Sequence, residues 1–480
     1  MSQDALTAQI LQKITPKPEE RLKVNALSQI FEQKIQQACQ SEGIDATVRV
    51  EGSVAKDTWL SENQDIDIFM RLPISIARKN LDEISLRIAK KAAGDAKQIE
   101  RFAEHPYLEI FVDGYRIDIV PCYDTKPGEW QSATDRTPYH TNYIRTHLCQ
   151  ECTGEVRLLK KFMQGIGVYG AEIKIGGFSG YLCELLVMQY SSFEGVIRAF
   201  ADYSKRIIVD IEGAYANGTK KLELIFVEPL VVVDPVDMNR NVASAVQPQK
   251  LYEFIGAARA YLKAPSQEFF YPPPIQALPP DIVEARFATQ TTTQLCVVIG
   301  GIEAVPDVLW GQLYRTKRAL RKLLESHDFE ILRDAVWSNE STLCVFVFEL
   351  KNQMLPSVKK HLGPQLERQG ECERFLAKYI DKNNVYVGPY IEEGRWVVEM
   401  PRKYSKATTL LKEKLADGGK SMGIAELVAE AIKQNCKVIT DGEILESYRE
   451  NADFAVFLTK FLTGKPFWLA TQKADFQLSF

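Results

Sequence analysis

The chain has 480 residues, of which 45% are hydrophobic and 25% are charged, an ordinary composition for a globular protein of about two to four domains. No apolar run approaches the roughly 18 residues that a membrane-spanning helix needs, and residues 1–13 lack the apolar block of a secretory signal, so we expect a cytoplasmic protein with no membrane partner. The net charge of −4 argues against a protein that coats nucleic acid non-specifically, although it allows a local basic groove.

The first 120 residues alternate between helical and strand-like patterns of apolar residues. We expect helices at residues 15–41, 54–60 and 81–93, and strands at 47–50, 65–72, 107–112 and 115–120. Asp113-Gly114, between the last two strands, is a strong two-residue hairpin signal. The segment therefore predicts a small sheet combined with helices.

The middle of the chain has a mostly helical pattern. Residues 155–200 and 250–262 show helical spacing, with a glycine-rich break at 165–180. Residues 231–237 form a short apolar run that is typical of a strand. The proline-rich segment 272–280 is the expected linker to a separate C-terminal region.

The C-terminal region has a recognisable order of expected strands and helices. We expect strands at residues 295–302, 329–337, 343–350 and 395–400, and helices at 310–324 and 365–379. The order β-α-β-β-α-β is typical of a ferredoxin-like unit, a layout that many RNA-binding modules share. A fold of this kind does not by itself establish RNA binding.

Three aspartates in predicted strands carry the clearest chemistry. Side chains alternate along a strand, so Asp65 and Asp67 share one face while Ile66 and Ile68 point to the other. Asp118 lies between two isoleucines in a later strand. Two carboxylates about 4 Å apart repel by roughly 4 kcal/mol at an effective dielectric constant of 20. A divalent cation removes this cost, and Mg²⁺ prefers carboxylate oxygens while leaving room for phosphates.

The turn before these strands has the residues that bind phosphate. Gly52 lets the backbone approach a phosphate closely, and the Ser53 hydroxyl can donate a hydrogen bond to it. Lys56 follows three residues later and adds positive charge on the same side. Taken alone, Gly-Ser before a helix is usually only a turn and a cap, and Asp-x-Asp is common in strands that bind no metal.

The combination is more specific than its parts. A strand, a Gly-Ser turn, eleven intervening residues, Asp-x-Asp on a strand and a third Asp on a later hairpin are the pattern of the polymerase-β-like nucleotidyltransferase superfamily. Three carboxylates beside a phosphate-binding turn suit phosphoryl transfer with two metal ions.

Longer segments resemble the archaeal-type (class I) CCA-adding enzymes, which are tRNA nucleotidyltransferases. The similar segments follow one another in the order of that family: 52–60, 103–107, 118–123, 135–140, 155–160, 167–172, 177–181, 233–237, 240–243, 264–266 and 363–365. The resemblance implies an α+β multidomain protein. Its parts would be a polymerase-β-like nucleotidyltransferase palm with a small mixed sheet at 1–147, a helical central domain that completes the nucleotide pocket at 148–278, and a ferredoxin-like, RNA-binding C-terminal body and tail at 279–480.

The resemblance also implies an activity and its partners. The enzyme would add CCA to the tRNA 3′ end without a template, from CTP and ATP, with release of pyrophosphate, in tRNA maturation and repair. The tRNA acceptor arm would be the macromolecular partner, held by the C-terminal region through its shape and backbone. The sequence leaves both a monomer and a homodimer open.

By the same resemblance, individual residues take roles. Asp65, Asp67 and Asp118 would hold two Mg²⁺ ions, with Asp118 on the metal that activates the primer 3′-hydroxyl. Contacts to the triphosphate or sugar would come from Gly52, Ser53, Lys56, His140, Lys160 and Tyr169. Arg240 would lie near the incoming base, where its donors match the acceptors of cytosine or adenine. Lys56 stands where relatives often carry Arg, which keeps the charge but loses bidentate phosphate contact.

Each of these assignments has a simpler alternative. His140 could be an ordinary hydrogen-bonded histidine, Lys160 a solvated helix residue and Tyr169 a core residue. For the whole chain the alternatives are a poly(A)-type or second-messenger nucleotidyltransferase, which would share the carboxylates, and a catalytically silent RNA-binding protein. The intact carboxylate cluster argues against the silent protein, because a repulsive cluster gives a binding protein no advantage.

Two further motifs suggest functions that we reject. Residues 165–170 match GxGxxG, but a dinucleotide-binding loop follows a strand, and here a helical pattern precedes it. Cys149 and Cys152 form a CxxC pair without a second pair or histidines at ligand spacing, so we expect no zinc site. All nine cysteines are expected to be free thiols.

Overall fold

The computed structural model describes residues 3–63, 65–102, 105–216 and 218–470. The chain divides into two compact units. The N-terminal unit comprises Met1–Pro274 with Lys465–Phe480, and the C-terminal unit comprises Ile275–Gly464. Residues 103 and 104, the first two of the segment 103–107 singled out above, lie outside the described residues. Within the described ranges, no helix is both long and apolar enough to cross a bilayer.

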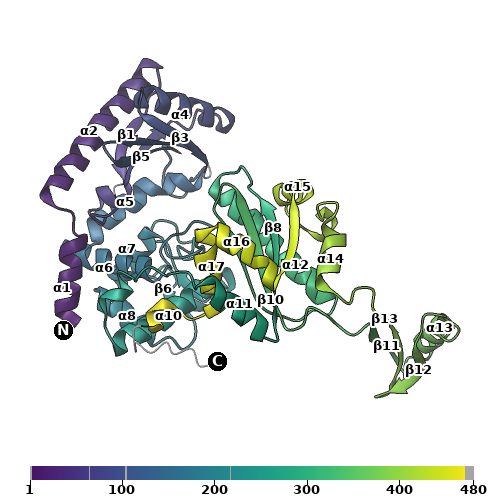
Figure 1. The fold of residues 1–480 in the computed structure, drawn as a ribbon. Coiled ribbons are helices and arrows are strands. Elements are labelled where there is room, and N and C mark those ends of the chain that lie inside the picture. Colours follow the sequence, from purple (N-terminus) through teal and green to yellow (C-terminus); the bar gives the residue numbers. More distant parts are fainter. Residues whose placement is uncertain (1–2, 64, 103–104, 217, 471–480) are drawn as a thin grey trace. The chain divides into compact units, whose positions relative to one another are not determined.

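The N-terminal unit begins with a five-stranded mixed sheet in the order β1-β2-β5-β4-β3; β1, β3 and β5 are labelled in Figure 1. Its strands are β1 (Thr47–Glu51), β2 (Asp65–Leu72), β3 (Lys97–Phe102), β4 (Pro106–Val112) and β5 (Tyr115–Tyr123). The β2–β5 pair is parallel, and the other pairs are antiparallel. Ile66 and Ile68 face a core shared with helices α2 (Pro18–Ser41) and α4 (Arg78–Ala93), as their alternation predicted. The strand β3 was not expected.

Two of the predicted helices near the N-terminus were wrong in extent. The helix expected from residue 15 begins at Pro18, and a separate helix, α1 (Gln3–Ile14), precedes it. Pro16 and Pro18 separate the two because proline has no N–H to continue a helical ladder. The helix expected at 54–60 is only the single turn α3 (Gly52–Ala55), and the chain turns away at Asp57, which has a φ of 52°. Asp57 is held there by side chains from other helices, which local periodicity cannot reveal.

The rest of the N-terminal unit is mainly helical. Its elements are α5 (Thr137–His147), α6 (Cys152–Gly165), α7 (Gly180–Tyr190), α8 (Phe193–Ala201), α9 (Thr219–Ile225), α10 (Pro248–Lys263), α18 (Phe467–Ala470), and the parallel pair β6 (Ile207–Val209) and β7 (Leu230–Val232). The 3₁₀ turns η1 (Ala133–Arg136) and η2 (Gln267–Phe269) connect them. Phe162 of α6 lies at the centre of this core, in ring contact with Phe193, Phe254 and Tyr261.

Two expectations about this region change. Cys149 and Cys152 form a disulfide, so the prediction that all cysteines are free thiols was wrong for this pair. The three-residue spacing across the turn that starts α6 brings their α-carbons to 5.1 Å, within the range that a disulfide spans. The strand expected at 231–237 is confined to β7, because the chain turns after Val233 into a polar loop.

The C-terminal unit contains a four-stranded antiparallel sheet in the order β14-β8-β10-β9. These strands are β8 (Thr293–Gly300), β9 (Ile331–Ser338), β10 (Leu343–Leu350) and β14 (Cys436–Thr440), and helices α12 (Pro306–Ser326) and α15 (Glu426–Gln434) complete a ferredoxin-like β-α-β-β-α-β order. Further helices are α11 (Pro280–Thr289), α14 (Ala407–Leu415), α16 (Ile444–Glu450) and α17 (Ala452–Thr463), with 3₁₀ turns η3 (Lys420–Met422) and η4 (Asp441–Glu443).

The predicted second half of that ferredoxin-like unit was wrong. Residues 365–379 and 395–400 belong instead to an insert with its own sheet, in the order β11-β13-β12. The insert comprises β11 (Val358–Gln365), α13 (Gln369–Tyr379), β12 (Val387–Glu392) and β13 (Arg395–Pro401). Both α13 and α15 have an amphipathic pattern, but only α15 buries its apolar residues, Val428 and Ile432 among them, in the main core. Periodicity cannot choose between two such helices.

Candidate active site

Four acidic residues form a row across the N-terminal sheet. The register pairs Glu51 with Asp67, Asp67 with Asp118, and Asp118 with Glu109. Adjacent strands of a sheet lie about 4.8 Å apart, so these carboxylates repel one another. Burial raises the pKa of Asp67, and the neighbouring Asp65 raises it further. The row therefore makes an unfavourable contribution to the stability of the fold.

Arg116 supplies the positive charge at this row. Its guanidinium lies 3.0 Å from Asp65 and 3.3 Å from Asp118. The contact with Asp118 does not have hydrogen-bond geometry, so the buried Oδ1 of Asp118 has no hydrogen-bond partner. Burial raises the pKa of Asp118 to about 7, although Arg116 acts in the opposite direction. The sequence analysis did not single out Arg116, whose place in the apolar strand β5 was the available signal.

The carboxylates are suited to a divalent cation, but they are not gathered around one point. Among the residues that the structure describes, no three Asp, Glu, His or Cys side chains are grouped closely enough to hold a metal ion as they stand. The donor set, however, consists of carboxylate oxygens, which hard cations prefer. The unpartnered Oδ1 of Asp118 is one such donor, and Arg116 already compensates the charge that a cation would neutralise. The chemistry of the row therefore fits a hard divalent cation.

The turn at Gly52-Ser53 lies directly beside the row. Gly52 has a φ of +65°, and a Cβ there would lie 2.1 Å from Oδ2 of Asp67, so no larger residue fits without moving that carboxylate. In the part of the chain that the structure describes, the Ser53 hydroxyl has no hydrogen-bond partner, and Ser53 lines the cavity described below. The turn thus places a small residue and a free donor next to the carboxylates.

Glu184 of α7 organises the positive charges. It is fully buried and accepts bonds from Lys56 at 2.6 Å, Thr58 at 2.5 Å and Lys160 at 3.4 Å. Burial raises the pKa of Glu184, but the two lysines outweigh this and lower it overall. Sequence analysis missed Glu184, although a single acidic residue in the otherwise apolar helix Gly180–Tyr190 was a usable signal.

Lys160 is more enclosed than a simple phosphate ligand would be. Its ammonium donates to the carbonyl and the hydroxyl of Thr58, both at 3.0 Å, in addition to Glu184. These three acceptors match its three donors. Burial lowers the pKa of Lys160. The alternative of a solvated helix residue is wrong for Lys160, since its side chain is 3% exposed.

Asp234 organises the opposite side of the site. It accepts bonds from His140 at 2.9 Å, Arg240 at 2.8 Å and Tyr181 at 3.1 Å. Burial would raise the pKa of Asp234, but the hydrogen bonds from His140 and the Val236 backbone, together with the charge of Arg240, outweigh it and lower the pKa to about 2. His140 also stacks on Tyr181, with ring centroids 4.1 Å apart. In the sequence, Asp234 stands out only as part of the family-like segment 233–237, and its three partners come from three separate segments.

A cavity of about 300 Å³ lies between the Gly52 turn, the carboxylates of Asp65 and Asp67, and Glu184. Its lining includes Gly52, Ser53, Lys56, Asp65, Asp67, Arg116, Lys160, Tyr169, Tyr181 and Glu184. Most of the predicted site residues therefore line one cavity, although Asp118, His140 and Arg240 are not part of its lining. His105 lies elsewhere, buried and paired with Asp82 at 2.9 Å. The GxGxxG match at 165–170 begins at the last residue of α6, as the preceding helical pattern predicted.

The chain is similar to known proteins along most of its length. Family models match in sequence: a nucleotidyltransferase domain at residues 32–140, the second domain of tRNA nucleotidyltransferase at 154–271, and the C-terminal domain of the CCA-adding enzyme at 290–441. The CCA-adding enzyme of Methanosarcina acetivorans is 36% identical, over 94% of this chain and 97% of its own. That of Methanothermobacter thermautotrophicus is 37% identical, over 97% and 98%.

A solved structure of a cytoplasmic RNA terminal U-transferase also aligns with part of the chain. It covers 56% of this chain and 98% of its own, with 16% sequence identity and a TM-score of 0.44. The full-length relatives above are much closer in sequence.

Proposed function

Because this chain belongs to the archaeal CCA-adding enzyme family, we propose that its cavity binds the incoming nucleotide and that Asp65, Asp67 and Asp118 catalyse its transfer. The protein adds CCA to the 3′ end of tRNA. The donors are CTP and ATP, and pyrophosphate is the other product. The observation that carries the assignment of the site is the register of Asp67 with Asp118 beside the Gly52 turn.

The carboxylate row is the proposed position of two Mg²⁺ ions. When bound, they would activate the attacking hydroxyl and neutralise the charge that develops on the transferred phosphate. Asp65, Asp67 and Asp118 would supply the oxygen ligands. Arg116 now pairs with two of these carboxylates, and in the loaded enzyme its guanidinium would be free to contact a phosphate oxygen.

The triphosphate would lie along the Gly52 turn. There the Ser53 hydroxyl and the turn backbone donate hydrogen bonds, and Lys56 lines the same cavity. Lys160 would contribute mainly through its charge, unless it exchanges its longest bond, that to Glu184 at 3.4 Å, for a phosphate oxygen. The phenol of Tyr169, also in the lining, would contact the sugar or triphosphate.

The side organised by Asp234 would bind the base and sugar. The carboxylate orients Arg240 and His140 at once. Arg240 presents only donors, which suit the ring nitrogen and carbonyl acceptors of cytosine and the N1 acceptor of adenine. The side chain of Arg240 is 36% exposed, so it is within reach of a ligand.

The C-terminal insert would contribute to holding the tRNA. A groove of about 570 Å³ in the insert is lined by His361, Arg368, Arg374, Lys378 and Arg395, with Glu371 as the only acidic residue in that lining. This is a local basic groove of the kind that the overall charge of −4 allows. Phosphate contacts from such residues fix the position of an RNA without reading its sequence.

The test uses the purified protein with Mg²⁺ and tRNA transcripts that end before CCA, after C and after CC. Each nucleotide triphosphate is supplied singly and then together, with products resolved to one nucleotide. We expect addition of C, C and then A, followed by a halt. Open-ended A tails would support the poly(A)-type alternative, addition of A alone would indicate a partial activity, and no incorporation on any transcript would contradict the proposal.

A further inference from the structure

Helix α6 holds the loop that follows the Gly52 turn by its backbone. Three consecutive carbonyls of that loop accept hydrogen bonds from two cationic side chains of α6. Arg157 donates to Asp57 O at 2.6 Å and to Trp59 O at 2.9 Å, and Lys160 donates to Thr58 O at 3.0 Å. Residues 157 and 160 are three apart, so they share one face of the helix. The loop is therefore aligned residue by residue along α6.

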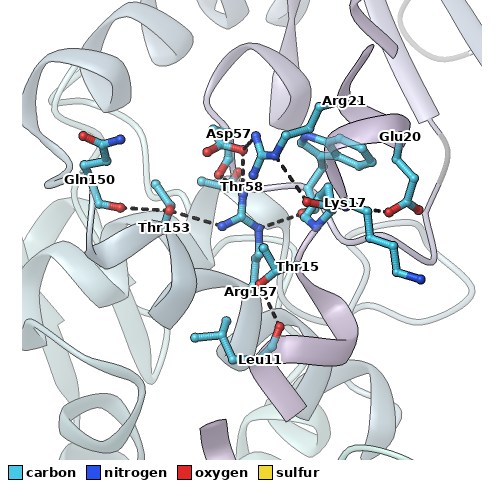
Figure 2. A network of polar contacts seen from close by, with 12 residues as sticks. Leu11, Thr15, Lys17, Glu20, Arg21, Asp57, Thr58, Gln150, Thr153 and Arg157 are labelled. Atoms are coloured by element: carbon cyan, nitrogen blue, oxygen red, sulfur yellow. Dashed lines mark hydrogen bonds and ion pairs between the residues drawn. The ribbon is translucent and has the colours of Figure 1, made fainter. Parts of the chain in front are cut away.

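Arg157 is the centre of this arrangement (Figure 2). In addition to the two carbonyls, it donates to Oδ1 of Asp57 at 2.6 Å and to Oγ1 of Thr153 at 3.2 Å. Its side chain is 4% exposed, so a neutral substitute would leave buried acceptors without donors. The planar guanidinium is suited to bonding several acceptors at fixed angles, which a lysine cannot reproduce.

Asp57 is the matching half of the contact. Its φ of 52° is a left-handed conformation in which Asp is tolerated better than most residues. Arg21 of α2 donates to the same Oδ1 atom at 2.7 Å, so Asp57 is held by α2 and α6 together (Figure 2). This conformation directs the chain from Lys56 into the buried Thr58. The positions of Lys56 and Thr58, the two neighbours of Asp57 in the chain, therefore depend on the conformation of Asp57.

We propose that Arg157 is a positioning residue for nucleotide binding, acting through Asp57 on Lys56 and Thr58. The proposal rests on the nucleotide site described above. Lys56 and Thr58 reach Glu184 only while the loop lies in register on α6. Release of the loop would separate the positive charge of Lys56 from that of Lys160, and both line the nucleotide cavity. Arg157 itself does not line that cavity.

The test compares Arg157→Gln with a matched arginine elsewhere in the same unit. Arg206 also ties two backbone carbonyls together, those of Phe226 and Glu228, and it does not line the cavity. Arg206→Gln therefore reproduces the loss of such an arginine without disturbing the loop. The measurements are kcat and KM for CTP and ATP, the Kd for labelled CTP with Mg²⁺ in the absence of tRNA, and the Kd for tRNA.

We expect Arg157→Gln to raise the KM and the Kd for CTP at least about tenfold, because small displacements of binding groups have large effects. The Kd for tRNA stays within about twofold, which is under half a kcal/mol. Arg206→Gln leaves all three constants near the wild-type values. Arg157→Lys and Asp57→Asn keep part of the contact, so their KM and Kd values for CTP should fall between those of wild type and Arg157→Gln. These two variants provide the test if Arg157→Gln does not fold.

The positioning role would be overturned if the Kd for CTP were unchanged in the variants of Arg157 and Asp57. It would also be overturned if Arg206→Gln raised the Kd for CTP as much as Arg157→Gln does. The binding measurement needs no turnover. A wild-type protein that binds CTP but transfers no nucleotide would contradict the proposed function, while the comparison of Kd values would still decide the role of Arg157.

Discussion

The carboxylate of Asp67 lies against the α-carbon of Gly52, so closely that a Cβ at residue 52 would be 2.1 Å from Oδ2. The Gly52 turn and the carboxylate row are thus one packed unit. A phosphate bound by the turn would therefore lie beside the carboxylates.

Gly52→Ala is therefore expected to abolish transfer and to destabilise the fold. The new methyl group must displace Asp67, and the φ of +65° disfavours alanine, so we expect a loss of at least about 1 kcal/mol in the free energy of unfolding. Gly43→Ala is the control, because Gly43 has a φ of +69° and nothing within 4 Å of its Cβ position. Nucleotide incorporation and urea unfolding check both variants. Equal activity in the two would show that the contact with Asp67 has no functional role.

Glu184→Gln should weaken both folding and nucleotide binding. The substitution removes the carboxylate charge that the buried ammonium groups of Lys56 and Lys160 contact directly, and removal of one partner of a buried pair costs about 3–5 kcal/mol. The KM values for CTP and ATP should rise together, since the lysines lie on the triphosphate side. Addition of Lys160→Met to Glu184→Gln should recover part of the stability, and strictly additive effects in this double-mutant cycle would refute the coupling.

Asp118→Asn separates function from stability. Loss of a proposed metal ligand removes several kcal/mol of transition-state stabilisation, which corresponds to a fall in turnover on the order of 10³-fold. The free energy of unfolding should stay equal or rise, because the acidic row loses one buried carboxyl group. Asp113→Asn, in the turn between β4 and β5, is the control, since its φ of 52° is compatible with Asn. Full turnover of Asp118→Asn would reject the carboxylate assignment.

His140 should make the stability depend on pH. Burial lowers its pKa below the usual 6.5, although Asp234 opposes this and Arg240 and Lys56 reinforce it. Below about pH 6.5 the unfolded chain takes up a proton that the folded chain refuses, so the contribution of His140 to stability falls as the pH falls. The stability advantage of wild type over His140→Gln should then be smaller at pH 5.5 than at pH 7.5 in urea unfolding. An advantage that grows on acidification would show that the charge of Asp234 outweighs burial.

The strands that carry the carboxylates could be predicted because their signal is local. Ile66 and Ile68 alternate with Asp65 and Asp67, and the structure gives β2 the predicted bounds, 65–72. The register that places Asp67 beside Asp118 could not be obtained in this way. It depends on β2 and β5 being parallel neighbours, with β3 and β4 beyond β5 in the sheet.

The ferredoxin-like unit shows where local patterns fail. Its element order was expected, but its second helix and last strand come from residues 426–440, after the insert. An amphipathic pattern predicts that a helix buries one face, but it does not predict which part of the protein that face packs against. The second helix of the ferredoxin-like unit is α15 and not α13, because α15 packs its apolar residues into the main core of the C-terminal unit.

By itself, the sequence determined the nature of the chemistry: aspartates in apolar strands, a Gly-Ser turn and segments shared with one enzyme family. Only the tertiary structure decided the partners. Glu184 reaches Lys56 across 128 residues of sequence, and Arg157 reaches Asp57 across 100. Such pairs have no local periodicity, because a buried charge is satisfied by whichever group the packing of helices brings within hydrogen-bond distance.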